Sequence, residues 1–89
     1  MHYCRKKNVI MRSVAGTHLL VPVNGFTRKV YTLNAAGCRL WELIEQPHTE
    51  DKLAQALAEQ YAIPRETALW DVRSFLKDMK KMDLLEEKK

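Results

Sequence analysis

The chain has 89 residues, of which 46% are hydrophobic and 29% charged, and its formal net charge is +4. This length predicts a single domain spanning residues 1–89, and the composition is that of an ordinary globular protein. No apolar run approaches the roughly 18–20 residues of a membrane span, and "VIMRSVAG" is too short and too polar for the core of a signal peptide. A cytoplasmic location is therefore expected.

The first half of the chain has the pattern of β-strands. Runs rich in Val, Ile, Tyr, Thr and Leu suit a half-buried pleat, and they predict strands over about 9–15, 18–23 and 28–33. The second and third runs are separated by Asn24–Gly25, a strong hairpin signal because both residues tolerate positive φ. The result is a three-stranded antiparallel meander preceded by residues 1–8, which we expect to be flexible.

The second half predicts three helices. Asn34 can cap "AAGCRLWELIEQ", which Pro47 ends, and Thr49 can cap "EDKLAQALAEQYA". Pro64 suits the start of the longest helix, "RETALWDVRSFLKDMKKMD". We expect residues 86–89 to fray.

The apolar residues recur at helical spacing and predict a buried stripe on each helix. The residues concerned are Ala36, Leu40, Leu43 and Ile44 in the first helix, Leu53, Ala56, Leu57 and Tyr61 in the second, and Leu69, Val72, Phe75, Leu76 and Met79 in the third. The predicted fold is therefore α+β and winged-helix-like, with a three-stranded antiparallel sheet followed by a three-helix bundle, in the order βββααα.

The positive charge is concentrated near the N-terminus. Residues 1–33 contain six Lys or Arg residues and no Asp or Glu, whereas all eleven acids lie between Glu42 and Glu87. Such an uneven distribution indicates either an acidic partner or a solvated basic face.

The sequence contains no clear motif for a catalytic site or a metal site. Cys4 and Cys38 are far apart without a C-x-x-C motif, and the three histidines are equally scattered. The glycines are isolated, so there is no phosphate-binding loop, and no Ser or Cys has a His partner at a recognisable spacing. We therefore expect no enzyme activity, no metal and no cofactor.

Two binding functions remain. A winged helix can bind nucleic acid, but residues 64–83 carry five basic and four acidic side chains, which makes duplex binding the alternative and not the leading hypothesis. The leading hypothesis is peptide binding, because an edge strand beside a long helix forms a groove in which an extended peptide can add to the sheet.

Several motifs together resemble the pyrroloquinoline quinone biosynthesis protein D (PqqD) family. They are "LLVPVNG", "LN" followed by small residues and "LWELI", then "LAQALAEQY" after Thr49, Pro64, "DVRSFL" and the closing "DLL". The resemblance covers roughly residues 18–86. The chain departs from the family pattern at Gln46–Pro47–His48, where a glycine is missing before the second helix, and in the N-terminal "MHYCRKKN".

The resemblance implies a non-catalytic chaperone, a RiPP recognition element. Such proteins bind the leader of a ribosomally synthesised precursor peptide and present the peptide to a modifying enzyme, commonly a radical S-adenosylmethionine protein. The leader is held as an added strand against the third strand and the third helix. The expected partners are thus a leader peptide and such an enzyme, with no membrane, and the protein itself is a monomer or homodimer.

The groove is expected to be formed by the third strand and one flank of the third helix. The opposite flank, with Asp71, Ser74, Asp78 and Met82, remains open as an alternative. The predicted peptide-binding residues are Lys29, Val30, Tyr31, Thr32, Leu33, Leu69, Arg73, Leu76, Lys77 and Lys80.

Overall fold

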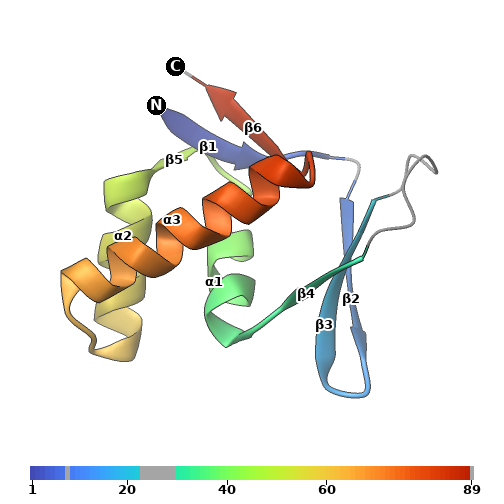
Figure 1. Cartoon of the computed structure of the whole chain (residues 1–89), viewed down its shortest axis with the longest axis horizontal. Coiled ribbons are helices and arrows are strands. Elements are labelled where there is room, and N and C mark those ends of the chain that lie inside the picture. The colour runs from blue at the N-terminus through green and yellow to red at the C-terminus, as the bar shows by residue number, and fades with distance from the viewer. Residues whose placement is uncertain (8, 23–29, 89) are drawn as a thin grey trace.

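A computed structural model describes residues 1–7, 9–22 and 30–88 (Figure 1). In chain order the elements are β1 (His2–Arg5), β2 (Val9–Val14), β3 (Thr17–Pro22), β4 (Tyr31–Leu33), α1 (Ala35–Leu43), β5 (His48–Thr49), α2 (Glu50–Tyr61), α3 (Arg65–Lys81) and β6 (Leu85–Lys88). The α+β class and the order of the three main strands and the three helices agree with the prediction. No helix in the described ranges is long and apolar enough to cross a membrane.

The predicted meander is the sheet β2-β3-β4, in which both pairs are antiparallel. The β2–β3 hairpin turns at Ala15 and Gly16, which both have positive φ, as two-residue hairpin loops of this kind require. In Figure 1 this hairpin projects away from the three helices. The predicted Asn24–Gly25 turn and Lys29 lie outside the described residues.

The helices begin where the sequence predicted. The Asn34 side chain accepts a hydrogen bond from the Gly37 N–H at 2.7 Å, and the Thr49 hydroxyl accepts one from the Lys52 N–H at 3.2 Å. Each side chain satisfies a backbone donor that has no partner within its helix. Pro64 precedes α3 as expected.

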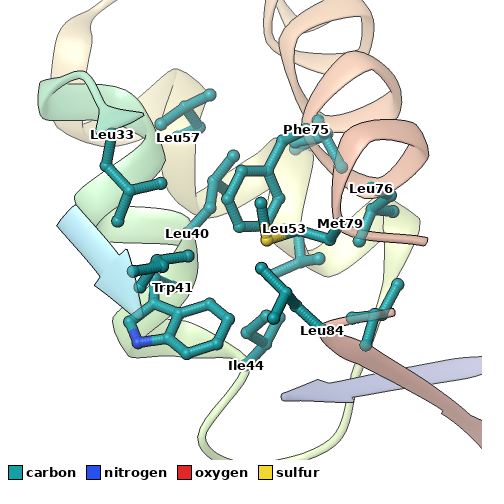
Figure 2. Close-up of a cluster of buried hydrophobic side chains, with 14 of the residues drawn as sticks. Leu33, Leu40, Trp41, Ile44, Leu53, Leu57, Phe75, Leu76, Met79 and Leu84 are labelled. Atoms are coloured by element: carbon teal, nitrogen blue, oxygen red, sulfur yellow. The ribbon is translucent and has the colours of Figure 1, made fainter. Parts of the chain in front are cut away.

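One hydrophobic core joins all three helices to β4 and to the C-terminal segment (Figure 2). Its largest side chain is Trp41, which is 1% exposed, and the Arg5 guanidinium lies 5.3 Å from the centre of the Trp41 ring system. Most of the predicted stripe residues are buried, but Tyr61 is 40% exposed, and Ala54, which was not among the predicted residues, is buried in α2.

A second sheet, β5-β1-β6, was not predicted. The expectation of a flexible N-terminal segment and a frayed C-terminus is corrected here, because β1 and β6 pair along four residues, from His2↔Lys88 to Arg5↔Leu85. The Arg5 N–H also donates to the Ile44 carbonyl at 2.9 Å. The two ends of the chain therefore lie side by side above the helices (Figure 1).

Candidate functional site

A pocket of about 340 Å³ separates β4 and the start of α1 from α3. The residues that line it are Tyr31, Thr32, Leu33, Asn34, Ala36, Gly37, Leu40, Asp71, Ser74, Phe75 and Asp78. Leu33, Leu40 and Phe75 are buried core residues that provide an apolar floor, whereas Asp71 and Ser74 are exposed at its rim.

The abrupt junction of β4 and α1 shapes one wall of this pocket. Leu33 ends the strand with its side chain in the core, and Asn34 caps the helix directly. A Cβ atom added to Gly37 would lie 3.1 Å from both Asn34 Oδ1 and Leu33 Cδ2, which is closer than ordinary van der Waals contact. The glycine thus allows the strand and the first helical turn to approach each other closely.

A hydrogen bond connects the two walls. The Tyr31 hydroxyl on β4 donates to Asp78 Oδ2 on α3 at 3.0 Å. Burial raises the pKa of Tyr31 to about 12, and the hydrogen bond to the negative Asp78 carboxylate contributes to the same shift. The raised pKa keeps the Tyr31 hydroxyl protonated, and so able to donate to Asp78, to a higher pH than that of an ordinary tyrosine.

One edge of β4 remains open. Its register with β3 runs from His18↔Leu33 to Leu20↔Tyr31, and no strand of the described segments pairs with its other edge. An open edge offers backbone N–H and C=O groups to a further extended chain. An open strand edge beside a pocket with an apolar floor and a polar rim suits the binding of an extended chain by strand addition.

The predicted peptide-binding residues on the strand and those on the helix lie in different parts of the structure. Tyr31, Thr32 and Leu33 line the pocket, whereas Val30, which is 47% exposed, borders a neighbouring depression with Tyr31 and Asp78. Lys29 lies outside the described residues. The strand part of the predicted site is thus largely brought together.

The predicted helix flank does not face β4, and this is a correction. Leu69 is half-buried against the core, and a second pocket near β1 and β6 is lined by the other four residues, Arg73, Leu76, Lys77 and Lys80. The flank that lines the pocket beside β4 is the alternative one, with Asp71, Ser74 and Asp78. Helical periodicity defines both flanks of a stripe equally well, so the flank that faces β4 is set by the tertiary packing and is not visible in the local sequence pattern.

The groups that line the pocket are suited to binding. Within the described residues, no three His, Cys, Asp or Glu side chains gather where they could hold a metal ion. Cys38, on α1 but not among the lining residues, has its pKa raised by burial and then by the nearby Glu42 charge, which favours its neutral thiol. The pocket offers shape, apolar surface and hydrogen-bonding groups.

Comparison with solved structures identifies similar folds. TbiB1 in complex with the TbiA(beta) leader peptide has a TM-score of 0.77 and 24% identity, with 97% of this chain and 98% of that chain covered. A lasso peptide synthetase B1 complexed with the leader peptide has the same TM-score at 14% identity, with 96% and 98% covered.

A third similar structure is the solution NMR structure of the PqqD truncation of Methylobacterium extorquens PqqCD, described as a functional, stand-alone RiPP recognition element. Its TM-score is 0.77 at 17% identity, with 97% of this chain and 89% of that chain covered. No curated protein sequence matches the chain. The sequence model of Coenzyme PQQ synthesis protein D (PqqD), however, matches residues 17–85. The chain, with its β4–α1 corner and open strand edge, therefore belongs to the PqqD family.

Proposed function

We propose that the protein is a non-catalytic chaperone that binds the leader of a ribosomally synthesised precursor peptide. The observation that carries this proposal is the open edge of β4 beside the pocket whose other wall is α3. Membership of the PqqD family supports it, as do the similar folds of TbiB1 and the lasso peptide synthetase B1, which were solved with leader peptides.

The leader would extend the sheet β2-β3-β4 by backbone hydrogen bonds to β4. Alternate side chains of an added strand point to opposite faces, so every second leader residue would point toward α3. The floor of Leu33, Leu40 and Phe75 suits an apolar leader side chain.

The rim adds an electrostatic preference. Asp78 already accepts the Tyr31 hydroxyl, whereas Asp71 is exposed and forms no ion pair with any described residue. A Lys or Arg of the leader could pair with Asp71. We therefore infer a leader that carries a basic residue near its apolar anchor.

Bound leader would be presented to a modifying enzyme, for which a radical S-adenosylmethionine protein is the proposed partner. The chain itself would contribute no reacting group. Its part is to hold one end of the precursor on a preorganised edge, which limits the entropy lost on binding. The Tyr31–Asp78 hydrogen bond and the Asn34 cap both contribute to that preorganisation.

The proposal is tested with a synthetic leader from a precursor gene adjacent to the gene for this protein. We expect binding in the micromolar range or tighter, about −8 kcal/mol, and no turnover of the peptide. Titration of the ¹⁵N-labelled protein should shift the amides of residues 31–37 and 71–78 together. Shifts confined to β1 and β6 would contradict the proposed groove.

A matched pair of variants tests the rim. Asp71→Asn should weaken the leader about twofold to fivefold, because an exposed ion pair contributes up to about 1 kcal/mol. Glu66→Gln removes the same charge from the exposed first turn of α3, outside the pocket, and should leave affinity unchanged. An equal loss of leader affinity in both variants would show that Asp71 acts only through general charge attraction and not through a specific ion pair.

A further inference from the structure

A second pocket, which we call the terminal pocket, lies on the other flank of α3. It has a volume of about 240 Å³ and lies between α3, the first turn of α2 and the terminal strands β1 and β6. The residues that line it are Tyr3, Glu50, Arg73, Leu76, Lys77, Lys80 and Glu87. None of these residues lines the pocket between β4 and α3, which we call the groove.

The cations of the terminal pocket are not equivalent. Arg73 forms an ion pair with Glu50, and Lys80 forms one with Glu87. Lys77 lies four residues after Arg73 and three before Lys80, so the three cations share one helix face. Lys77 forms no ion pair with any other described residue.

The surroundings favour an anion at Lys77. Leu76 is only 5% exposed and forms an apolar base, and Tyr3, paired with Glu87 in the β1–β6 register, adds a half-buried ring with a hydroxyl donor. An apolar wall reduces the screening of a nearby charge pair by water. Because Glu50 and Glu87 each hold one flanking cation, the positive charge that remains unmatched is centred on Lys77.

We propose that the terminal pocket binds a carboxylate side chain from an acidic segment of a protein partner. The proposal does not depend on leader binding, because the two pockets lie on opposite flanks of α3 and share no residue. Both could therefore be occupied at once, one by the leader and the other by the acidic partner.

A protein carboxylate fits the terminal pocket better than a nucleic acid does. Duplex DNA carries one negative charge per roughly 1.7 Å of its axis, and it is bound by several unpaired cations at once. Here Glu50 and Glu87 belong to the walls and would repel the neighbouring phosphates. A single carboxylate needs only the one unpaired cation, and the side chains around it on a peptide can turn away from the glutamates.

The test uses the full chain and a blocked hexaglutamate peptide, with hexaglutamine as the uncharged control. Titration of the ¹⁵N-labelled protein at low salt should give saturable shifts at Tyr3, Leu76, Lys77 and Glu87, and these shifts should weaken as salt is added. Hexaglutamine should produce none. Inorganic phosphate and a short DNA duplex, titrated in parallel, should bind more weakly than hexaglutamate.

Variants separate a specific site from general attraction. Lys77→Gln should weaken hexaglutamate about threefold to fivefold, and Lys77→Arg should retain most of the affinity. Arg12→Gln removes the same charge from the exposed face of the β2–β3 hairpin and should have no effect. Circular dichroism should show all three variants folded, because both positions are exposed.

Three outcomes would overturn the proposal. Equal losses in Lys77→Gln and Arg12→Gln would leave only general charge attraction. Shifts at residues 31–37 in place of the terminal pocket would assign the acidic peptide to the other groove. Tighter binding of the duplex or of phosphate at Lys77 would make the pocket a site for nucleic acid or free anions.

Discussion

Tyr31 and Asp78 are the residues that tie the two walls of the groove together. The phenol comes from a short strand and the carboxylate from the long helix, 47 positions later in the sequence. The bond is partly buried, so it exchanges less readily with water than a surface contact would. Its two partners therefore influence the width of the groove as well as the stability of the fold.

Replacing Tyr31 with Phe should lower the free energy of unfolding by about 1 kcal/mol at pH 7, because the ring is kept and only the hydrogen bond is lost. Urea denaturation measures this difference. Tyr61→Phe, at a 40% exposed position, is the control and should change little.

The parent protein and Tyr31→Phe should respond differently to alkaline pH. The pKa of Tyr31 is raised from 10.0 to about 12 in the folded state, so the neutral phenol is favoured by folding. The stabilisation is fully present below pH 10 and is lost as the pH rises through 12. The difference in free energy of unfolding between the parent and Tyr31→Phe should therefore become smaller over this pH range. A difference that stays constant would contradict the raised pKa of Tyr31.

The β4–α1 junction is the element on which the groove depends. The strand ends and the helix begins at a single residue, Asn34, with no intervening loop. A joint of this kind leaves the chain few alternative conformations, and it fixes the direction of the open β4 edge relative to α1. Its stability rests on one side-chain cap and on the small residue at position 37.

Asn34→Ala should reduce the free energy of unfolding by about 1 kcal/mol, because the Gly37 N–H loses its acceptor. Asn34→Asp restores an acceptor and should retain most of the stability. Thr49→Ala at the cap of α2 gives a matched comparison within the same protein. If Asn34→Ala leaves the urea midpoint unchanged, the β4–α1 junction does not depend on the hydrogen bond from the Gly37 N–H to the Asn34 side chain.

Strand addition at β4 can be tested with proline. Adjacent residues of a strand direct their N–H groups to opposite edges, so proline at Tyr31 and at Thr32 removes a donor from different edges. One variant should mainly destabilise the sheet, since its N–H bonds β3. The other should keep the fold and weaken the leader peptide. Titrations with Tyr31→Ala and Thr32→Ala correct for side-chain loss, and two folded proline variants with parental affinity would refute strand addition.

At the scale of the whole molecule, the two chain ends form a sheet that lies beside one flank of α3. β1 is its central strand, with β5 on one edge and β6 on the other. This sheet also brings Leu84 and Leu85 into the core. Its residues Tyr3 and Glu87 line the terminal pocket, which lies on the flank of α3 opposite the pocket beside β4.

Cys4→Pro should lower the free energy of unfolding by about 1–3 kcal/mol, because a proline in a central strand removes a ladder hydrogen bond. Cys4→Ala is the control for the loss of the thiol and should cost less. Urea denaturation compares the two variants directly. Identical midpoints would mean that β1 contributes little to the stability of the folded chain.

Local patterns in the sequence determined most of the elements. β2 and β3 lie within a residue of the predicted strands, and Asn34, Thr49 and Pro64 begin the three helices as expected. These features depend on residues close together in the chain, such as a capping side chain and a donor three positions later. Motifs in the same region also indicated the PqqD family, and the match of the family model over residues 17–85 confirms that prediction.

The tertiary structure decided what lies on each side of α3. Three of the four β1 residues are half-buried and three of the four β6 residues are exposed, and neither segment has a clear alternation of apolar residues, so neither predicts a strand alone. They form because residues about eighty positions apart meet, and pairing at that distance in sequence is invisible to local patterns. The terminal sheet lies beside the flank of Lys77, and β4 lies beside the flank of Asp71. The helical period shows that α3 has two flanks on opposite sides of its apolar stripe. Which flank lies beside β4 and which beside the terminal sheet depends on the packing of segments that are distant in the sequence.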